Sequence, residues 1–355
     1  MLTVVSVSMT TAALCLAVFV VVVRVLRLRR QRTAMVALAP HRMALLAVGA
    51  DEDEDGLGLA HLLGVDERAW QSAGPAVVAM LGKVRGTPAD HLVTVLRQHG
   101  DIARAVEDLG SQSVVRRARA AHVLGLVRDR KHVEDLRELL SDQSAEVRLV
   151  AVRALGAIGD PAVADEVLAT VGAVRGRVGV PAYVVAEALV AMGAGTNESV
   201  LHGLHREDPV VRTVAALVAG HITLVPASRS LRELLEHDGD FDVRLTASVA
   251  LGQVGGPEDV DSLSRHTSPQ TSAPLRRTCA AALGEVGNTR AVWVLLPLLA
   301  DPDRRLAEIA AHSLIRIGPE GAERLTETPA GTPPGRVARA ALAVARLPVL
   351  AEDPP

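Results

Sequence analysis

The chain has 355 residues, of which 49% are hydrophobic, 22% are charged and 1% are aromatic, and its formal net charge at pH 7 is −3. So few aromatic residues disfavour both an enzyme with a typical ligand pocket and a protein that stacks on nucleic-acid bases. A slightly acidic chain also repels phosphates, so we expect no nucleic-acid partner.

The first predicted element is a membrane-spanning helix. Residues 2–23 contain no charged side chain, and as a helix they would extend roughly 33 Å, enough for a hydrocarbon layer of about 30 Å. Five arginines follow: Arg24, Arg27, Arg29, Arg30 and Arg32. The positive-inside rule then predicts an uncleaved anchor (residues 1–23) of a single-pass cell-membrane protein, with a cytoplasmic C-terminal domain.

Residues 24–50 are interpreted as a basic juxtamembrane segment. They carry six arginines and no acidic residue, so of the net charge of −3 this segment supplies +6 and the remaining chain carries −9. We therefore expect membrane contact through residues 2–23 and through the basic flank 24–32, which anionic lipid headgroups would attract.

Residues 51–110 are expected to form a helical N-terminal cap for the repeats that follow. Apolar residues at helical spacing predict helices in five ranges: 42–48, 57–63, 76–84, 89–98 and 102–109. The acidic run from Asp51 to Asp55 lacks the alternating ligands and the central glycine of a calcium loop, which favours a solvated turn over a metal site.

Residues 111–346 repeat one pattern. It is clearest in EVRLVAVRALGAIGDP, residues 146–161, where apolar residues recur on one helical face and Gly-Asp-Pro ends one helix and begins another. Gly156 defines a marker position that recurs at intervals of 30 to 34 residues: Gly125, Gly156, Val190, Gly220, Gly252, Gly284 and Ile315. Repeats too small to bury their own apolar face must stack, which predicts a solenoid.

Three further columns support this register. The residue before the marker position and the residue two after it are apolar in all seven repeats, and the residue five before it is mostly small. Cys279 belongs to the small column, so we expect a buried thiol rather than a reactive one. Neither Cys15 nor Cys279 has a plausible disulfide partner, which fits a reducing compartment.

The segments Val147-Arg148, Ala154-Leu155-Gly156 and Gly159-Asp160-Pro161 resemble HEAT repeats, particularly the short bacterial kind also found in phycobilisome lyases. The resemblance covers residues 111–346 and implies an all-α solenoid of about seven to eight antiparallel helix pairs, here preceded by one transmembrane helix and followed by a tail, residues 347–355. It places the first helices at 132–140, 163–170, 229–236, 257–264 and 290–299. The third and last repeats depart from the pattern.

Eight residues before the marker position stands a column of arginines: Arg117, Arg148, Arg212, Arg244 and Arg276. Ala182 and Ala307 take this place in the two divergent repeats. On a helical wheel the column points toward the next repeat, so we interpret it as a structural ladder rather than a phosphate-binding stripe. The resemblance implies pairing with turn acids of neighbouring repeats, and Asp142, Asp208 and Asp242 stand just upstream. Asp242 is also expected to cap its helix.

Opposite the predicted buried face lie the positions seven and three residues before the marker. We call these residues the outer row: Leu149, Arg153, Tyr183, Glu187, Thr213, Leu217, Leu245, Val249, Arg277 and Ala281. The row is unexpectedly apolar in the middle repeats. We expect it to line a concave face and to bind an amphipathic helix, with Arg153, Glu187 and Arg277 setting orientation at the rim. The alternative is that neighbouring helices cover it.

The leading hypothesis is a membrane-tethered cytoplasmic scaffold that binds a protein partner, and by analogy alone that partner could be a membrane enzyme. We expect no enzymatic activity, cofactor or metal. His202 and His205, with Glu198, lack the HExxH arrangement of a zinc site. Two alternatives stay open: an enzyme similar to bilin lyases, which the predicted anchor and the few aromatic residues disfavour, and a structural spacer without a partner.

Overall fold

The computed structural model describes residue 24 and residues 39–172, 176 and 178–345. The predicted membrane span at 2–23 and nearly all of the basic flank lie outside these ranges. The described residues form α-helices and short 3-10 helices without a strand, which confirms the all-α class. They divide into two compact units, one ending at Val127 and the other beginning at Arg128.

The described part of the first unit, from residue 39 onward, consists of helices joined by turns. They are η1 (Ala39–His41), α2 (Arg42–Gly49), α3 (Leu57–Leu63), α4 (Glu67–Leu81), α5 (Thr87–Gln98), α6 (Asp101–Asp108) and α7 (Val114–Val127). At its centre the buried Trp70 ring stacks on the His99 ring with 3.7 Å between their centroids. Its Nε1 donates a 2.6 Å hydrogen bond to Asp101. One aromatic side chain thereby joins α4 to α5 and α6.

Two details of the first unit follow from capping carboxylates. Helix α4 begins well before the predicted start at residue 76, because the Asp66 carboxylate accepts hydrogen bonds from the first free backbone N–H groups of the helix. In the acidic run, the Asp53 carboxylate accepts hydrogen bonds from the N–H groups of Gly58 and Leu59 at 2.7 and 2.8 Å. The run is thus the turn that starts α3.

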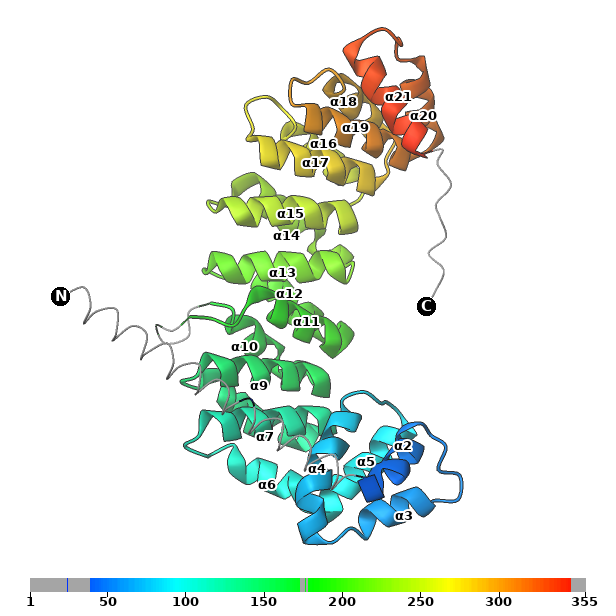
Figure 1. Ribbon diagram of the computed structural model, residues 1–355. Helices are drawn as coiled ribbons and strands as arrows, with labels where there is room; N and C mark the ends of the chain where they lie inside the picture. Colours follow the sequence, from blue (N-terminus) through cyan, green and yellow to red (C-terminus); the bar gives the residue numbers. More distant parts are fainter. Residues whose placement is uncertain (1–23, 25–38, 173–175, 177, 346–355) are drawn as a thin grey trace, which may run out of the picture. The chain divides into compact units, whose positions relative to one another are not determined.

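The second unit consists of successive helix pairs (Figure 1). The first helices of its described pairs are α8 (Val133–Glu138), α10 (Ala164–Ala169), α12 (Asn197–Gly203), α14 (Ser228–His237), α16 (Val260–Arg265), α18 (Arg290–Leu298) and α20 (Pro319–Glu327). The second helices are α9 (Ala145–Ile158), α11 (Ala182–Met192), α13 (Pro209–His221), α15 (Phe241–Val254), α17 (Ala273–Val286), α19 (Arg304–Ile317) and α21 (Pro333–Ala345). Consecutive second helices pack side by side, which confirms a HEAT-like helical solenoid.

Short 3-10 helices flank several first helices. They are η2 (Arg130–His132), η3 (Leu139–Ser141), η4 (Pro161–Val163), η5 (Gly193–Thr196), η6 (Val225–Ala227) and η7 (Pro257–Asp259). At the Gly-Asp-Pro turn, Gly159 adopts a left-handed φ of 75° at the end of α9, and the Asp160 carboxylate accepts a hydrogen bond from Ala162 N–H. The turn therefore acts as the sequence predicts. Helix α15, however, is capped by Asp240 and not by Asp242, because only Asp240 precedes the helix.

The glycines at the marker position lie where neighbouring second helices approach one another most closely. A Cβ atom on Gly156 would lie 2.7 Å from the Cα of Ala188, and one on Gly284 would lie 2.7 Å from the Cα of Ser313. The same arrangement recurs at Gly220 with Ala250 and at Gly252 with Ala282. Since such distances are shorter than a carbon–carbon contact, neighbouring second helices touch backbone to backbone at these glycines.

Two of the predicted interior columns, one and five residues before the marker, are buried in all seven repeats, whereas the column two residues after it is half-buried at Ile222, Val286 and Ile317. Directly before the marker, Leu155, Leu251 and Leu283 have an exposed fraction of 0%. Cys279 is buried too, and burial raises the pKa of its thiol to about 12, which leaves it protonated and unreactive at neutral pH. Along these columns the core of the repeats is thus built from small and aliphatic side chains.

Candidate functional site

The outer row is largely exposed in the second unit. The exposed fractions are 56% for Tyr183 on α11, 46% for Leu217 on α13 and 44% for Val249 on α15. Leu149 and Leu245 are half-buried. Because each of these helices buries its opposite face in the stack, the exposed apolar residues are not required for the core. They lie on neighbouring helices and form an apolar patch.

Two apolar residues that the sequence analysis did not single out extend this patch. Val210, in the first turn of α13, is 46% exposed, and Phe241, the first residue of α15, is 37% exposed. Val210 is the second residue after the capping residue of its helix and stands ten residues before the marker position. Phe241 directly follows its capping residue and stands eleven residues before the marker. Extending the outer row by one helical turn toward the N-terminus of each second helix would have found them. We call Tyr183, Val210, Leu217, Phe241, Leu245 and Val249 the central patch.

The three charged residues predicted at the rim differ in their contacts. Arg153 and Glu187 are exposed on α9 and α11. Arg277 is half-buried, and its Nε and a terminal nitrogen donate hydrogen bonds of 2.8 and 2.9 Å to the carboxylate of Asp303. Asp303 also caps α19, and the bond from Arg277 holds the pKa of its carboxyl below the usual value. Arg277 therefore joins α17 to the start of α19.

The predicted arginine ladder makes contacts of two kinds. Each of Arg117, Arg148 and Arg212 donates to the backbone carbonyls five and six residues before it, which ties the loop to the helix that follows. Arg212 also binds both carboxylate oxygens of Asp238 at 2.7 and 2.9 Å, and Arg276 binds the carboxylate of Asp301. These second contacts reach the following repeat.

The acid that pairs with Arg212 is therefore not Asp208, the upstream residue that the sequence suggested. Asp208 lies upstream of Arg212 but caps α13 by accepting a hydrogen bond from Val210 N–H at 2.8 Å. The pairing acids stand 25 or 26 residues downstream of their arginines, in the loop of the next repeat. Arg148, which is 1% exposed, contacts the carbonyl oxygen of Val178 in the equivalent place. Arg244 lies 5.9 Å from the centre of the Phe241 ring.

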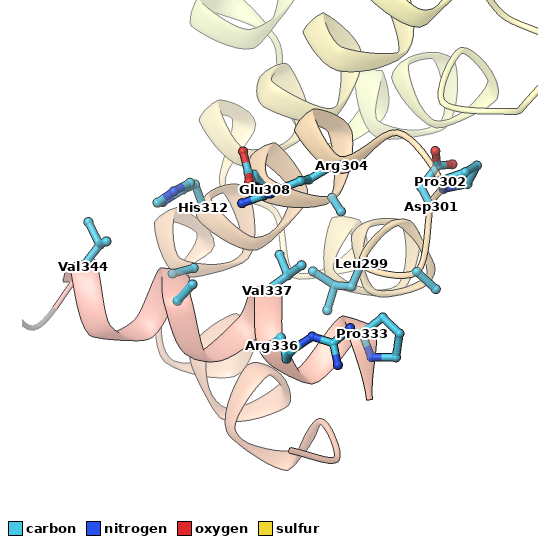
Figure 2. Close-up of a pocket in the computed structure, with 14 residues that line it drawn as sticks. Leu299, Asp301, Pro302, Arg304, Glu308, His312, Pro333, Arg336, Val337 and Val344 are labelled. Carbon is cyan, nitrogen blue, oxygen red and sulfur yellow. Dashed lines mark hydrogen bonds and ion pairs between the residues drawn. The ribbon is translucent and has the colours of Figure 1, made fainter. Parts of the chain in front are cut away.

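A cavity of about 550 Å³ lies between α19 and α21, close to the loop that joins α18 to α19 (Figure 2). Its α19 wall carries Glu308 and His312, which stand seven and three residues before the marker residue Ile315. The cavity therefore lies on the same face of the second helices as the outer row. The repeat pattern gives no sign of this cavity, because α21 follows the last marker position, Ile315.

In the described ranges no three His, Cys, Asp or Glu side chains converge as a metal site would require. His205 bonds to Ser230 at 3.0 Å between Nε2 and Oγ, and His202 is exposed on α12. None of the helices that the structure describes combines the length and apolar composition of a bilayer span, and the predicted span at 2–23 falls outside the described ranges.

Part of the chain matches a known repeat family. A family model described as HEAT repeats matches residues 102–175. A search of curated proteins gave no match. Among solved structures, Escherichia coli YibA is 18% identical, with 74% of this chain and 96% of that chain covered and a TM-score of 0.41.

Two of the similar structures bear the names of enzymes. Human deoxyhypusine hydroxylase is 19% identical, with 79% of this chain and 98% of that chain covered and a TM-score of 0.31. The CpcE–CpcF complex of phycocyanin lyase from Nostoc is 20% identical, with 81% of this chain and 92% of that chain covered and a TM-score of 0.27. The expectation that the chain is not an enzyme is contradicted by these matches, because structures similar to it include enzymes.

Proposed function

We propose that the protein is a HEAT-repeat scaffold that binds a partner protein across the exposed face of its second helices, close to a membrane. The observation that carries this proposal is the exposed central patch. Tyr183, Leu217 and Val249 lie in the outer row of three successive second helices, Tyr183 one turn before the position of the other two, and each is about half exposed. Exposed apolar side chains grouped on one face are typical of a protein-binding surface.

The spacing of the second helices suggests which kind of partner fits. Packed helices lie about 8 to 10 Å apart, and a helix that crosses them rises about 1.5 Å per residue. Residues seven apart on such a helix are therefore about 10.5 Å apart, close to the distance between neighbouring second helices. An amphipathic helix with apolar residues at intervals of seven would place one on each of α11, α13 and α15.

A membrane location is the second part of the proposal and rests on the sequence. The uncharged stretch 2–23 is followed by five arginines between Arg24 and Arg32, a pattern typical of a span whose C-terminal side faces the cytoplasm. A tether of this kind would hold the repeats near membrane-bound partners. It would raise the effective concentration of scaffold and partner without requiring strong contacts.

Site-specific crosslinking tests the binding surface. A photoreactive phenylalanine analogue at Leu217, in the full-length protein in its native membranes, is expected to give one discrete crosslinked product. The same analogue at Val225 provides the control, because Val225 is 62% exposed but lies in η6, outside the outer row. Crosslinks of equal yield and pattern from both positions would contradict a specific surface.

Charge substitution tests the same surface by loss of binding. Leu217→Asp together with Leu245→Asp is expected to leave thermal unfolding close to wild type, since Leu217 is 46% exposed and Leu245 is only half-buried. The crosslinked product, with the photoreactive residue now at Val249, should disappear. If the double variant unfolds instead, the leucines belong to the core and the proposed surface is wrong.

A further inference from the structure

The cavity between α19 and α21 has a cause in the sequence. At the marker position α17 has Gly284, which allows backbone contact with α19, whereas α19 has Ile315. A branched side chain there prevents an equally close approach of the next helix, and α21 indeed packs less extensively on α19 than α19 does on α17. The resulting space of about 550 Å³ has the size of a small-ligand or side-chain pocket.

The walls of the cavity combine apolar side chains with one unpaired positive charge. Leu299 and Val337 lie across the gap from each other in Figure 2. Arg304 is paired with Glu308 at 2.9 Å, and Asp301 is paired with Arg276. Arg336 is exposed, and its guanidinium makes no hydrogen bond or ion pair with any residue in the described ranges.

The cavity continues the outer row, and the inference drawn from it rests on the proposed function. Glu308 and His312 on α19 occupy the row positions that Leu245 and Val249 occupy on α15. A partner helix that crosses α11, α13 and α15 and continues along the stack would next meet α17 and then this cavity. A partner helix bound to the central patch would therefore extend toward Arg336.

We propose that the cavity between α19 and α21 is the terminal socket of the partner-binding surface, and that it receives an acidic–aliphatic segment of the partner protein. An aliphatic side chain of the partner enters the space between Leu299 and Val337. A neighbouring Asp or Glu carboxylate accepts hydrogen bonds from the guanidinium of Arg336, whose planar donors fit a carboxylate in bidentate geometry. The socket thereby fixes the direction in which the partner lies along the repeats.

Paired crosslinking positions test the socket. The photoreactive analogue is placed at Leu217 in one variant and at Val344, an exposed residue at the other end of the cavity from Arg336, in a second. The experiment uses the full-length protein in native membranes. Both positions are expected to capture the same protein, and the peptide crosslinked at Val344 should contain Asp or Glu beside Leu, Ile or Val.

The role of Arg336 is tested with charge variants. Arg336→Glu is expected to lower the crosslinking yield at Val344 by about tenfold, while Arg336→Lys keeps most of it. Arg305→Glu provides the matched control, because Arg305 is exposed on α19 outside the cavity and the substitution changes the net charge equally. All three variants should have wild-type melting temperatures.

The outcomes separate the two proposals. If Leu217 captures a partner but Val344 does not, or if Arg336→Glu leaves the yield at Val344 unchanged, the socket is refuted and the scaffold proposal stands. If neither position captures a partner, the scaffold proposal fails as well. A crosslink from Val344 to this same chain, or a captured peptide without Asp or Glu, also overturns the socket.

Discussion

At the scale of single residues, the glycines at the marker position decide how closely the second helices pack. Gly156→Ala is expected to lower the free energy of unfolding by about 1 to 3 kcal/mol, the usual cost of overpacking. The added methyl group would meet the backbone of Ala188, which cannot rotate away. The helix propensity of alanine alone would favour the variant by up to about 1 kcal/mol. Urea-induced unfolding followed by circular dichroism measures the difference.

The control for this substitution is Gly239→Ala. A Cβ atom there has nothing within 4 Å, and Gly239 does not require a left-handed φ. This variant should therefore unfold like the wild type. A Gly156→Ala protein as stable as the wild type would show that the backbone contact between α9 and α11 is not tight.

The Arg277–Asp303 pair predicts a pH dependence. The hydrogen bond from Arg277 lowers the pKa of Asp303 in the folded state, so its contribution to stability is fully present above the ordinary Asp pKa of about 3.9. The contribution is lost as the pH falls through the lowered value. Arg277→Gln should therefore reduce the urea midpoint at neutral pH, and the difference from wild type should shrink in acid below about pH 4.

Arg153→Gln is the matched comparison for that variant, because Arg153 belongs to the same outer row and is exposed. Its urea midpoint should follow the wild type across the whole pH range. A pH-independent effect of Arg277→Gln would mean that the loss comes from packing of the arginine stem and not from the ion pair.

The sequence predicts which residues are buried better than it predicts which residues form ion pairs. The buried columns follow directly from the spacing of apolar residues along one helix. The partner of a ladder arginine is a different problem, since it depends on the loop of the next repeat. Asp238 pairs with Arg212 and Asp301 with Arg276 because loop length brings those carboxylates within reach, and a helical wheel contains no information on loops.

At the scale of helices, two leucines on second helices differ in burial although the residue type is the same. Leu251 on α15 has an exposed fraction of 0%, and Leu217 on α13 has 46%. Leu251→Ala should lower the free energy of unfolding by about 2 to 5 kcal/mol because it leaves a cavity, whereas the identical change at Leu217 should cost less than about 0.5 kcal/mol. Equal losses in urea-induced unfolding would mean that the assigned helix faces are wrong.

Second helices are predicted from the sequence more completely than first helices. A second helix such as α9 has four turns of periodic apolar residues, whereas α10 and α12 have six and seven residues, too few for a clear period. Helix α4 is a different case. It continues through Pro75, so the prediction began one residue after that proline, although the capped first turns hold Trp70 in the core.

At the scale of the whole molecule, a repeat architecture distributes the candidate site over many helices. The outer row could be found from sequence because every repeat contributes the same positions. The cavity beside α21 could not, because it arises where the repeat pattern changes, at Ile315, and because α21 has no marker residue of its own within the described ranges. Irregular ends of repeat arrays therefore need a structure before their surfaces can be described.

Removal of residues 1–38 tests the proposed tether. The described units begin at Ala39 and bury their own apolar cores, so the shortened protein is expected to keep the helical circular dichroism spectrum of a folded chain. The full-length protein should remain with membranes after alkaline carbonate extraction, because a span of about 20 apolar residues withstands it. The shortened protein should appear in the soluble fraction.

The same shortened protein separates a tether from a peripheral membrane contact. If the repeats themselves bound lipid through charge, the fragment would stay with membranes at low salt and leave them at high salt, since exposed charges more than about 10 Å apart are screened at 0.1 M ionic strength. A span predicts a different result, because the fragment should then be soluble at every salt concentration. Retention of the fragment on membranes even at high salt would contradict the tether, because residues beyond 38 would then suffice for membrane binding.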